Sequence, residues 1–325
     1  MSVRPKIAIL CLGGCGGCDA AVIDLDGALL TVAERAEIVL WPIALDHKRN
    51  RLDTLADGEL HLAILNGSIR TSEHLELARL MRRKAQTVLG LGACACFGGT
   101  PGLANLRRRE DLLEWIYRQA PTVDNPEGII PRVSTQVAGR ELQLPELLEQ
   151  LHTLDQAIGV DYFLPGCPPP PDLVAAAIFA ALDGKLPPRG STLAPQQPLC
   201  DLCPRNRSKP YRLSVRELRR VHEVELDEET CFLARGVLCL GLATRAGCGG
   251  TCLAVNTPCR GCFGPVAGVR DNARLLSALA TLLQVDDDTE LAAMVERFLD
   301  PAGYCYRFTQ ASSILGSRTL PEEEP

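Results

Sequence analysis

The first apolar run of the chain is Lys6-Ile7-Ala8-Ile9-Leu10-Cys11-Leu12, and it ends in Gly13-Gly14. A run without polar alternation is typical of a parallel strand that is buried on both faces. The glycine pair allows the backbone to turn sharply at the carboxyl end of that strand. This stretch therefore predicts the first strand of an α/β sheet.

Strand and helix patterns alternate through the rest of the first half. Further strands are expected at residues 60–65, 87–91 and 161–164, and a fifth at residues 37–41, which Pro42 places toward a sheet edge. Thr71-Ser72 forms the N-cap of one expected helix, and an alanine-rich run over residues 172–182 forms another. Together these patterns predict an α/β fold with a flavodoxin-like open, mostly parallel sheet.

Four cysteines follow three of these strands. Cys15 and Cys18 follow the first strand, Cys94 follows residues 87–91, and Cys167 follows residues 161–164. In an open α/β sheet the carboxyl ends of the strands form one crevice, so four thiols are expected to converge there. Four thiolates suit a 4Fe-4S cluster. The alternative is a thioredoxin-type redox pair at Cys15 and Cys18, which gives Cys94 and Cys167 no role.

A second group of cysteines fills the last third of the chain, after a Pro- and Gly-rich linker at residues 184–198. Its eight members could occupy two four-thiolate sites, and they are Cys200, Cys203, Cys231, Cys239, Cys248, Cys252, Cys259 and Cys262. Long hydrophobic runs are missing here, so bound metal must replace much of the core. A zinc ribbon is the structural alternative, because paired Cys-x-x-Cys units also bind zinc.

Composition sets the outer bounds of the interpretation. The length of 325 residues favours two domains, and 34 Lys and Arg against 40 Asp and Glu argue against a nucleic-acid surface. No signal peptide and no run of ~20 apolar residues is found, so we expect a cytoplasmic protein without a membrane span. In that compartment the 15 cysteines are expected to bind metal rather than form disulfides.

Specific motifs resemble those of nickel–iron hydrogenase small subunits. The proximal-cluster motifs of that family are similar to Gly14-Cys15-Gly16-Gly17-Cys18-Asp19, Gly92-Ala93-Cys94-Ala95-Cys96-Phe97-Gly98-Gly99 and Pro165-Gly166-Cys167-Pro168-Pro169. The resemblance implies a proximal 4Fe-4S cluster bound by Cys15, Cys18, Cys94 and Cys167. Cys94 is preferred to Cys96 because the family's ligand precedes Ala-x-x-Gly-Gly.

The second cysteine group resembles the family's other two cluster segments. Cys200-Asp201-Leu202-Cys203-Pro204-Arg205 is similar to the distal opening, and residues 247–262 are similar to the medial segment. The resemblance implies a distal 4Fe-4S cluster on Cys200, Cys203, Cys231 and Cys239, and a medial 4Fe-4S cluster on Cys248, Cys252, Cys259 and Cys262. It divides the chain into a flavodoxin-like domain at residues 1–190, which binds the proximal cluster, and a ferredoxin-like two-cluster domain with a C-terminal tail at residues 191–325.

Two differences from periplasmic relatives, together with the C-terminal tail, indicate which group of the family the chain resembles. Many periplasmic relatives have a histidine at the position of Cys200, and many lack the fourth medial thiol that Cys252 supplies here. The tail segment at residues 300–308 is similar to the end of cytoplasmic group 3 small subunits, which include the methyl-viologen-reducing and deazaflavin-reducing types.

The resemblance implies an oxidoreductase subunit with no catalytic residue of its own. Electrons would come from a nickel–iron centre on a separate large subunit and pass through three 4Fe-4S clusters to an iron–sulfur or flavin acceptor subunit. One alternative is a subunit of a non-hydrogenase redox complex such as complex I, whose first loop typically has adjacent cysteines, unlike Cys15 and Cys18. A zinc-stabilised scaffold is the other.

Several residues near the proposed ligands have open roles. Cys11 is expected to be structural because it lies in a strand, and Cys96 and Cys305 are left over from the ligand sets. Asp19 either relays protons or is an acid in the first turn of a helix. Arg205, Arg245 and Arg260 either offset the negative charge of a cluster or are ordinary surface arginines.

Overall fold

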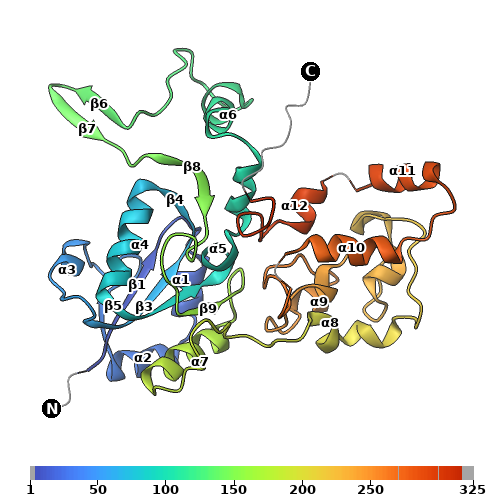
Figure 1. Ribbon diagram of the computed structural model, residues 1–325, viewed down its shortest axis with the longest axis horizontal. Helices are drawn as coiled ribbons and strands as arrows, with labels where there is room; N and C mark the ends of the chain where they lie inside the picture. The colour runs from blue at the N-terminus through green and yellow to red at the C-terminus, as the bar shows by residue number, and fades with distance from the viewer. Residues whose placement is uncertain (1–3, 270, 299, 317–325) are drawn as a thin grey trace.

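The computed structural model describes residues 4–269, 271–298 and 300–316. Its main feature is a five-stranded parallel sheet (Figure 1). In spatial order the strands are β2 (Glu37–Leu40), β1 (Lys6–Cys11), β3 (Leu60–Asn66), β5 (Ala85–Leu91) and β9 (Tyr162–Leu164). In chain order this is 2-1-3-4-5, the flavodoxin-like arrangement, so the predicted fold and the edge position of residues 37–41 are confirmed.

Helices cover both faces of this sheet because consecutive residues of its central strands are apolar, so that both faces are apolar. Ile7 and Ile9 face α1 (Gly17–Ile23), α2 (Gly27–Arg35) and α7 (Pro171–Leu182) in one core. Ala8 and Leu10 face α3 (Asn50–Asp53) and α4 (Ser72–Lys84) in a second core. The Thr71 side chain accepts the backbone N–H of His74 and so caps α4, as the sequence predicts. α5 (Gly92–Phe97) follows β5 directly.

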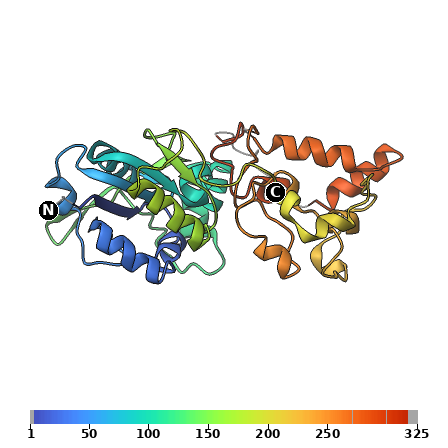
Figure 2. The ribbon, with the colours of Figure 1, turned by 90° about the horizontal axis from the view of Figure 1, so that it is seen from below.

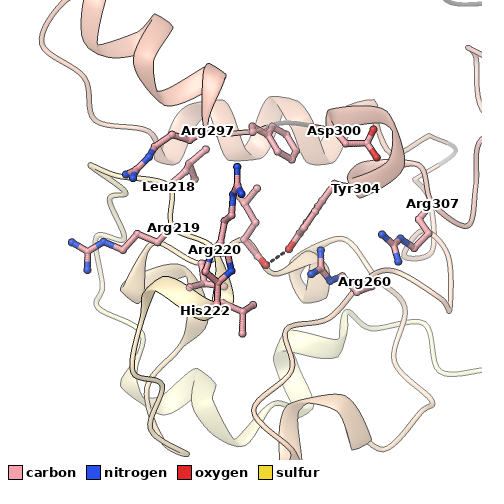
Figure 3. A pocket seen from close by; sticks show the side chains of 13 residues that line it. Leu218, Arg219, Arg220, His222, Arg260, Arg297, Asp300, Tyr304 and Arg307 are labelled. Carbon is pink, nitrogen blue, oxygen red and sulfur yellow. Dashed lines mark hydrogen bonds between the residues drawn. The ribbon is translucent and has the colours of Figure 1, made fainter. Parts of the chain in front are cut away.

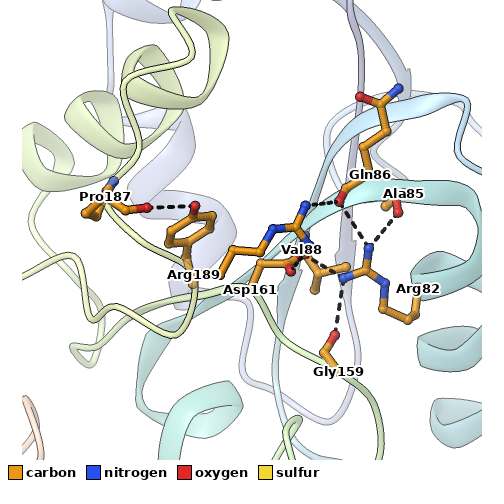
Figure 4. Close-up of polar contacts among 9 residues, drawn as sticks. Arg82, Ala85, Gln86, Val88, Gly159, Asp161, Pro187 and Arg189 are labelled. Atoms are coloured by element: carbon orange, nitrogen blue, oxygen red, sulfur yellow. Dashed lines mark hydrogen bonds and ion pairs between the residues drawn. The ribbon is translucent and has the colours of Figure 1, made fainter.

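Asp161 lies just before β9 rather than inside it, because its side chain holds other elements. Its carboxylate accepts hydrogen bonds from Arg82 at 2.6 Å, from Arg189 at 2.6 Å and from the backbone N–H of Val88 at 2.8 Å (Figure 4). This buried carboxylate therefore joins α4, β5 and the segment that follows α7.

Residues 100–152 form peripheral structure. They comprise η1 (Thr100–Leu106), α6 (Arg109–Glu114), η2 (Trp115–Gln119), a hairpin of β6 (Ser134–Val137) and β7 (Arg140–Gln143), and β8 (Leu147–His152), which pairs antiparallel with β4 (Ile69–Thr71). Figure 1 shows the hairpin standing away from the sheet.

The cysteine-rich part is built from short elements around a third core. These are α8 (Leu199–Leu202), η3 (Pro204–Ser208), η4 (Val221–Glu223), η5 (Phe232–Arg235), η6 (Leu240–Leu242), α9 (Thr251–Ala254), α10 (Ala273–Leu282), α11 (Asp288–Glu296) and α12 (Pro301–Cys305). Cys239 and Cys259 belong to this core together with side chains such as Phe232 and Leu240. Figure 2 shows this region beside the sheet region.

Two segments connect the regions. The expected linker is partly ordered on the sheet edge, since the Leu193 N–H donates to the Phe163 carbonyl at 2.7 Å. The tail returns to the sheet region, where the Phe308 carbonyl accepts the Gly99 N–H at 3.2 Å and the Ala311 carbonyl accepts the Gln156 side chain at 2.9 Å. Within the part of the chain that the structure describes, no helix has the length and apolar character to cross a membrane.

Candidate functional site

The carboxyl ends of β1, β5 and β9 bring four predicted ligands together. Cys15 lies in the loop after β1 and Cys18 in the first turn of α1, Cys94 is in α5, and Cys167 follows β9. The Ala93 N–H donates to the Gly166 carbonyl at 2.7 Å, which joins the second and third loops. Cys15 and Cys167 are exposed, so the crevice opens to the surface.

These four thiols lie close enough to affect one another's pKa. Burial raises the pKa of Cys18, and Cys94, Cys167 and Cys15 raise it further. Burial likewise raises the pKa of Cys94 to about 12, with Cys167 and Cys15 adding to the effect. Neighbouring thiolates destabilise each other, so this group can be fully deprotonated only if it binds a cation. The chemistry of the donors therefore fits a metal cluster.

Two glycines make room for these sulfurs. A Cβ on Gly92 would lie 2.2 Å from the Cys18 sulfur, and a Cβ on Gly99 would lie 2.4 Å from the Cys94 sulfur. Gly92 has φ +87° and Gly99 has φ +61°, so both also adopt a backbone conformation that favours glycine. Any other residue at either position would displace a predicted ligand.

The predicted distal ligands form a second group. Burial raises the pKa of Cys200 to about 12, and its neighbours Cys239, Cys231 and Cys203 act in the same direction, while Lys209 opposes them. The pKa of Cys239 is raised by burial, and the backbone N–H groups of Gly241 and Cys259 lower it. All four predicted distal cysteines thus lie near one another.

The predicted medial ligands form a third group, between the other two. Burial raises the pKa of Cys262 to about 12, and the thiols of Cys248, Cys167 and Cys252 contribute, while the Cys167 backbone N–H lowers it. Cys262 therefore neighbours both its own group and the proximal Cys167. At the other side, the Cys259 N–H donates to the Cys239 sulfur at 3.3 Å, which joins the medial and distal groups.

The spacing of these side chains can also be compared with what a single metal ion requires. Across residues 4–269, 271–298 and 300–316, no three Cys, His, Asp or Glu side chains lie close enough to hold one metal ion. A cube with four irons binds one thiolate at each iron, so it spaces its ligands more widely than one tetrahedral zinc ion does.

The chain is similar to known proteins over almost its whole length. Residues 15–181 match the family model described as NADH ubiquinone oxidoreductase, 20 Kd subunit. The iron-sulfur subunit of the F420-non-reducing hydrogenase of Archaeoglobus profundus is 38% identical over 317 residues, which are 96% of this chain and 98% of the relative. A subunit of the F420-non-reducing hydrogenase of Methanothermobacter thermautotrophicus is 33% identical over 326 residues, 99% of each chain.

The chain belongs to the nickel–iron hydrogenase small-subunit family. The prediction from its motifs that the chain is a subunit of an oxidoreductase is therefore confirmed. A solved [NiFeSe] hydrogenase from Desulfovibrio vulgaris Hildenborough shares the fold, with a TM-score of 0.53 and 16% identity over 82% of this chain and 95% of that one. Among the alternatives, the full-length likeness to hydrogenase subunits favours a hydrogenase over other redox complexes.

The three arginines that lie near proposed ligands in the sequence are buried or half-buried, so they are not ordinary surface arginines. Arg205 is 2% exposed, lies 4.4 Å from the Phe232 ring centre, and donates to the carbonyls of residues 227, 230 and 253 and to the Asn256 side chain. Arg245 is half-buried and donates to the Pro195 carbonyl at 3.1 Å. Arg260 is half-buried and stacks on the Tyr304 ring at 4.2 Å.

Asp19 has partners that its sequence position does not reveal. It is fully buried, and its carboxylate accepts the Trp41 indole N–H at 2.8 Å and the Asn66 amide at 2.9 Å. It thus fixes the first turn of α1, beside Cys18, to the ends of β2 and β3. Trp41 and Asn66 were missed by sequence reasoning, since neither belongs to a motif.

The three remaining cysteines are buried or half-buried. Cys96 is 5% exposed and its thiol lies 3.6 Å from the Gly90 carbonyl of β5, so it faces the sheet. Cys305 is 1% exposed within the third core. Cys11 is half-buried, and burial raises its pKa to about 11, with Asp19 contributing.

Proposed function

We propose that this chain is the electron-transfer small subunit of a cytoplasmic nickel–iron hydrogenase, which carries electrons from the nickel–iron site of a large subunit through three 4Fe-4S clusters to a redox partner. The observation that carries the proposal is the spatial continuity of three four-cysteine groups. Cys262 lies beside Cys167, and Cys259 lies beside Cys239, so each group touches the next.

The ligand sets follow from these groups. We assign Cys15, Cys18, Cys94 and Cys167 to the proximal cluster, Cys248, Cys252, Cys259 and Cys262 to the medial cluster, and Cys200, Cys203, Cys231 and Cys239 to the distal cluster. The first set belongs to a domain at residues 1–190 and the other two to a domain at residues 191–325. When bound, such clusters accept and donate single electrons.

The residues of the chain hold and shield these centres. Gly92 and Gly99 leave space for the proximal sulfurs, and the backbone N–H of Cys259 donates to the distal Cys239. Cys239 and Cys259 are buried, so water is largely excluded where the medial and distal groups meet. Hydrogen bonds to sulfur and exclusion of solvent are two of the factors that set cluster potentials.

The exposed end of the crevice suits the large subunit. Cys15 and Cys167 are the exposed members of the proximal set, so a partner that covers them would bring its metal centre near this cluster. An iron–sulfur or flavin subunit would take the electrons at the opposite, distal end. The nickel–iron centre would supply the chemistry of dihydrogen, and the chain alone is expected to be inactive.

Two serine substitutions test the proximal assignment. Cys94→Ser is expected to lose or convert the proximal cluster, because its sulfur is packed among the other three ligands. Cys96→Ser is the matched control and should keep all clusters, since its thiol faces the Gly90 carbonyl. Iron content and electron paramagnetic resonance on anaerobically purified protein distinguish the two. The reverse pattern would contradict the assignment.

Metal analysis tests the cluster count. Protein isolated without oxygen should be brown and contain about twelve irons, four for each cube. Zinc in place of iron, or colourless protein, would instead support the zinc-stabilised scaffold.

A further inference from the structure

A hollow rich in arginine lies in the cysteine-rich region, on the side of the third core formed by the C-terminal helices. We call it the basic hollow; it has a volume of about 360 Å³. Its charged lining is Arg219, Arg220, Arg260, Arg297 and Arg307, with His222 and Asp300. Figure 3 shows that these guanidinium groups come from four separate segments of the chain. No single helix or turn accounts for this concentration of positive charge.

Few carboxylates compensate these arginines. Arg219 and Arg297 both pair with Glu217. Asp300 is engaged by the Gly303 N–H at 2.8 Å, where it caps α12. Among the described residues, Arg220, Arg260 and Arg307 form no ion pair with a carboxylate, although Glu223 accepts the backbone N–H of Arg220. The hollow is therefore positive on a chain whose net charge is −6.

The floor of the hollow adjoins two of the cysteine groups. Arg260 stacks on Tyr304, and the Tyr304 hydroxyl donates to the Leu238 carbonyl, one residue before Cys239. Arg260 itself lies between Cys259 and Cys262 in the sequence. An occupant would thus lie near the junction of the medial and distal groups.

The hollow is also part of a longer groove. A second hollow, with a volume of about 440 Å³, shares Leu218 and Arg297 with it. α11 borders this second hollow, whose apolar lining is Leu218, Ala293 and Met294. A groove that runs from a basic end into a second hollow with apolar lining suits a polypeptide segment better than a single small anion.

We propose that the basic hollow docks an acidic segment of the protein that accepts electrons from this chain. This inference rests on the proposed function. Carboxylates of the partner would pair with Arg220, Arg260 and Arg307, which would hold its redox centre near Cys239. Because the rest of the chain is acidic on balance, an acidic partner would be attracted selectively to this face.

Charge reversal at the rim tests the proposal without touching any predicted ligand. The assay uses the complex of this chain with its large subunit, purified anaerobically, and measures hydrogen-driven reduction of an acidic 2Fe-2S ferredoxin and of methyl viologen. Arg220→Glu combined with Arg307→Glu should raise the ferredoxin KM about tenfold and weaken its dependence on salt, because the steering charge is reversed. Iron content and methyl viologen turnover should stay unchanged.

The matched control reverses the same charge elsewhere. Arg79→Glu with Arg83→Glu changes two exposed arginines of α4 that form no ion pair within the described residues, and it should leave the ferredoxin KM unchanged. Equal ferredoxin KM values for the basic-hollow variant and the parent would overturn the inference. So would a variant that loses calorimetric binding of inorganic phosphate or FMN while keeping its ferredoxin KM, since the hollow would then be a small-anion site. A parent complex without iron, or inactive toward methyl viologen, would overturn the proposed function itself.

Discussion

Two buried charges, one in each region, are stabilised in opposite ways. In the sheet region the Asp161 carboxylate lies between Arg82 and Arg189, so the charge is compensated by protein side chains (Figure 4). In the cysteine-rich region the Arg205 guanidinium is held by three backbone carbonyls and the Asn256 side chain. Within the described ranges it forms no ion pair with a carboxylate.

The buried charge of the sheet region is balanced by protein side chains, whereas that of the cysteine-rich region is not. A buried cation without an anion is costly. Arg205 follows Cys203 by two residues, so we expect the thiolates of the proposed distal cluster to supply negative charge to this part of the chain. The cores show the same difference: the buried residues of the two sheet cores include no cysteine, whereas those of the third core include Cys239 and Cys259.

Removal of iron should destabilise the cysteine-rich region far more than the sheet region, and it is the change with the largest expected effect. Anaerobic chelation is expected to expose the amides of residues 199–264 to rapid hydrogen exchange, because metal ligation stabilises that region. Amides of β1, β3 and β5 should stay protected, since no predicted ligand is among the buried residues of their cores and only Cys18 packs against one of them. Exchange followed by mass spectrometry gives both readings on one sample. Equal loss of protection in the two regions would show that their stabilities are not separate.

Substitution of Arg205 is expected to have the second largest effect. Arg205→Met leaves three carbonyls with no donor, which should destabilise the cysteine-rich region by about 3 kcal/mol, roughly 1 for each carbonyl. Local opening free energies from native-state hydrogen exchange near residues 227–256 measure this. Arg207→Met is the control, because Arg207 is exposed two residues away. If both variants behaved alike, the buried guanidinium would have no structural role.

Substitution of Asp161 should have a smaller effect, confined to the sheet region. Asp161→Ala removes the acceptor of three hydrogen bonds and leaves the partly buried Arg82 unpaired, at an expected cost of about 2–3 kcal/mol. Arg189→Ala should cost about 1 kcal/mol or less, because the Arg189 side chain is 66% exposed. Native-state hydrogen exchange of the β5 amides measures the effect of each substitution. A larger effect from Arg189 than from Asp161 would reverse our account of this ion pair.

The sequence predicted the elements whose residues interact over short distances along the chain. Continuous apolar runs located the strands, and Thr71 marked the start of α4. The buried partners of Asp19 could not be predicted, because Trp41 and Asn66 lie 22 and 47 residues away from it. The burial of Arg205 was missed for the same reason, since its acceptors lie 22 to 51 residues away.

By itself, the sequence determined the parallel sheet and the membership of the cysteine loops in a hydrogenase family, because both depend on local patterns and spacing. Only the tertiary structure decided that Cys262 meets Cys167, that Cys259 meets Cys239, and that arginines from four segments surround one hollow. Such contacts depend on how distant loops pack against each other. Packing is a property of the whole chain, so the order of the cysteine groups in space emerges only when the chain is folded.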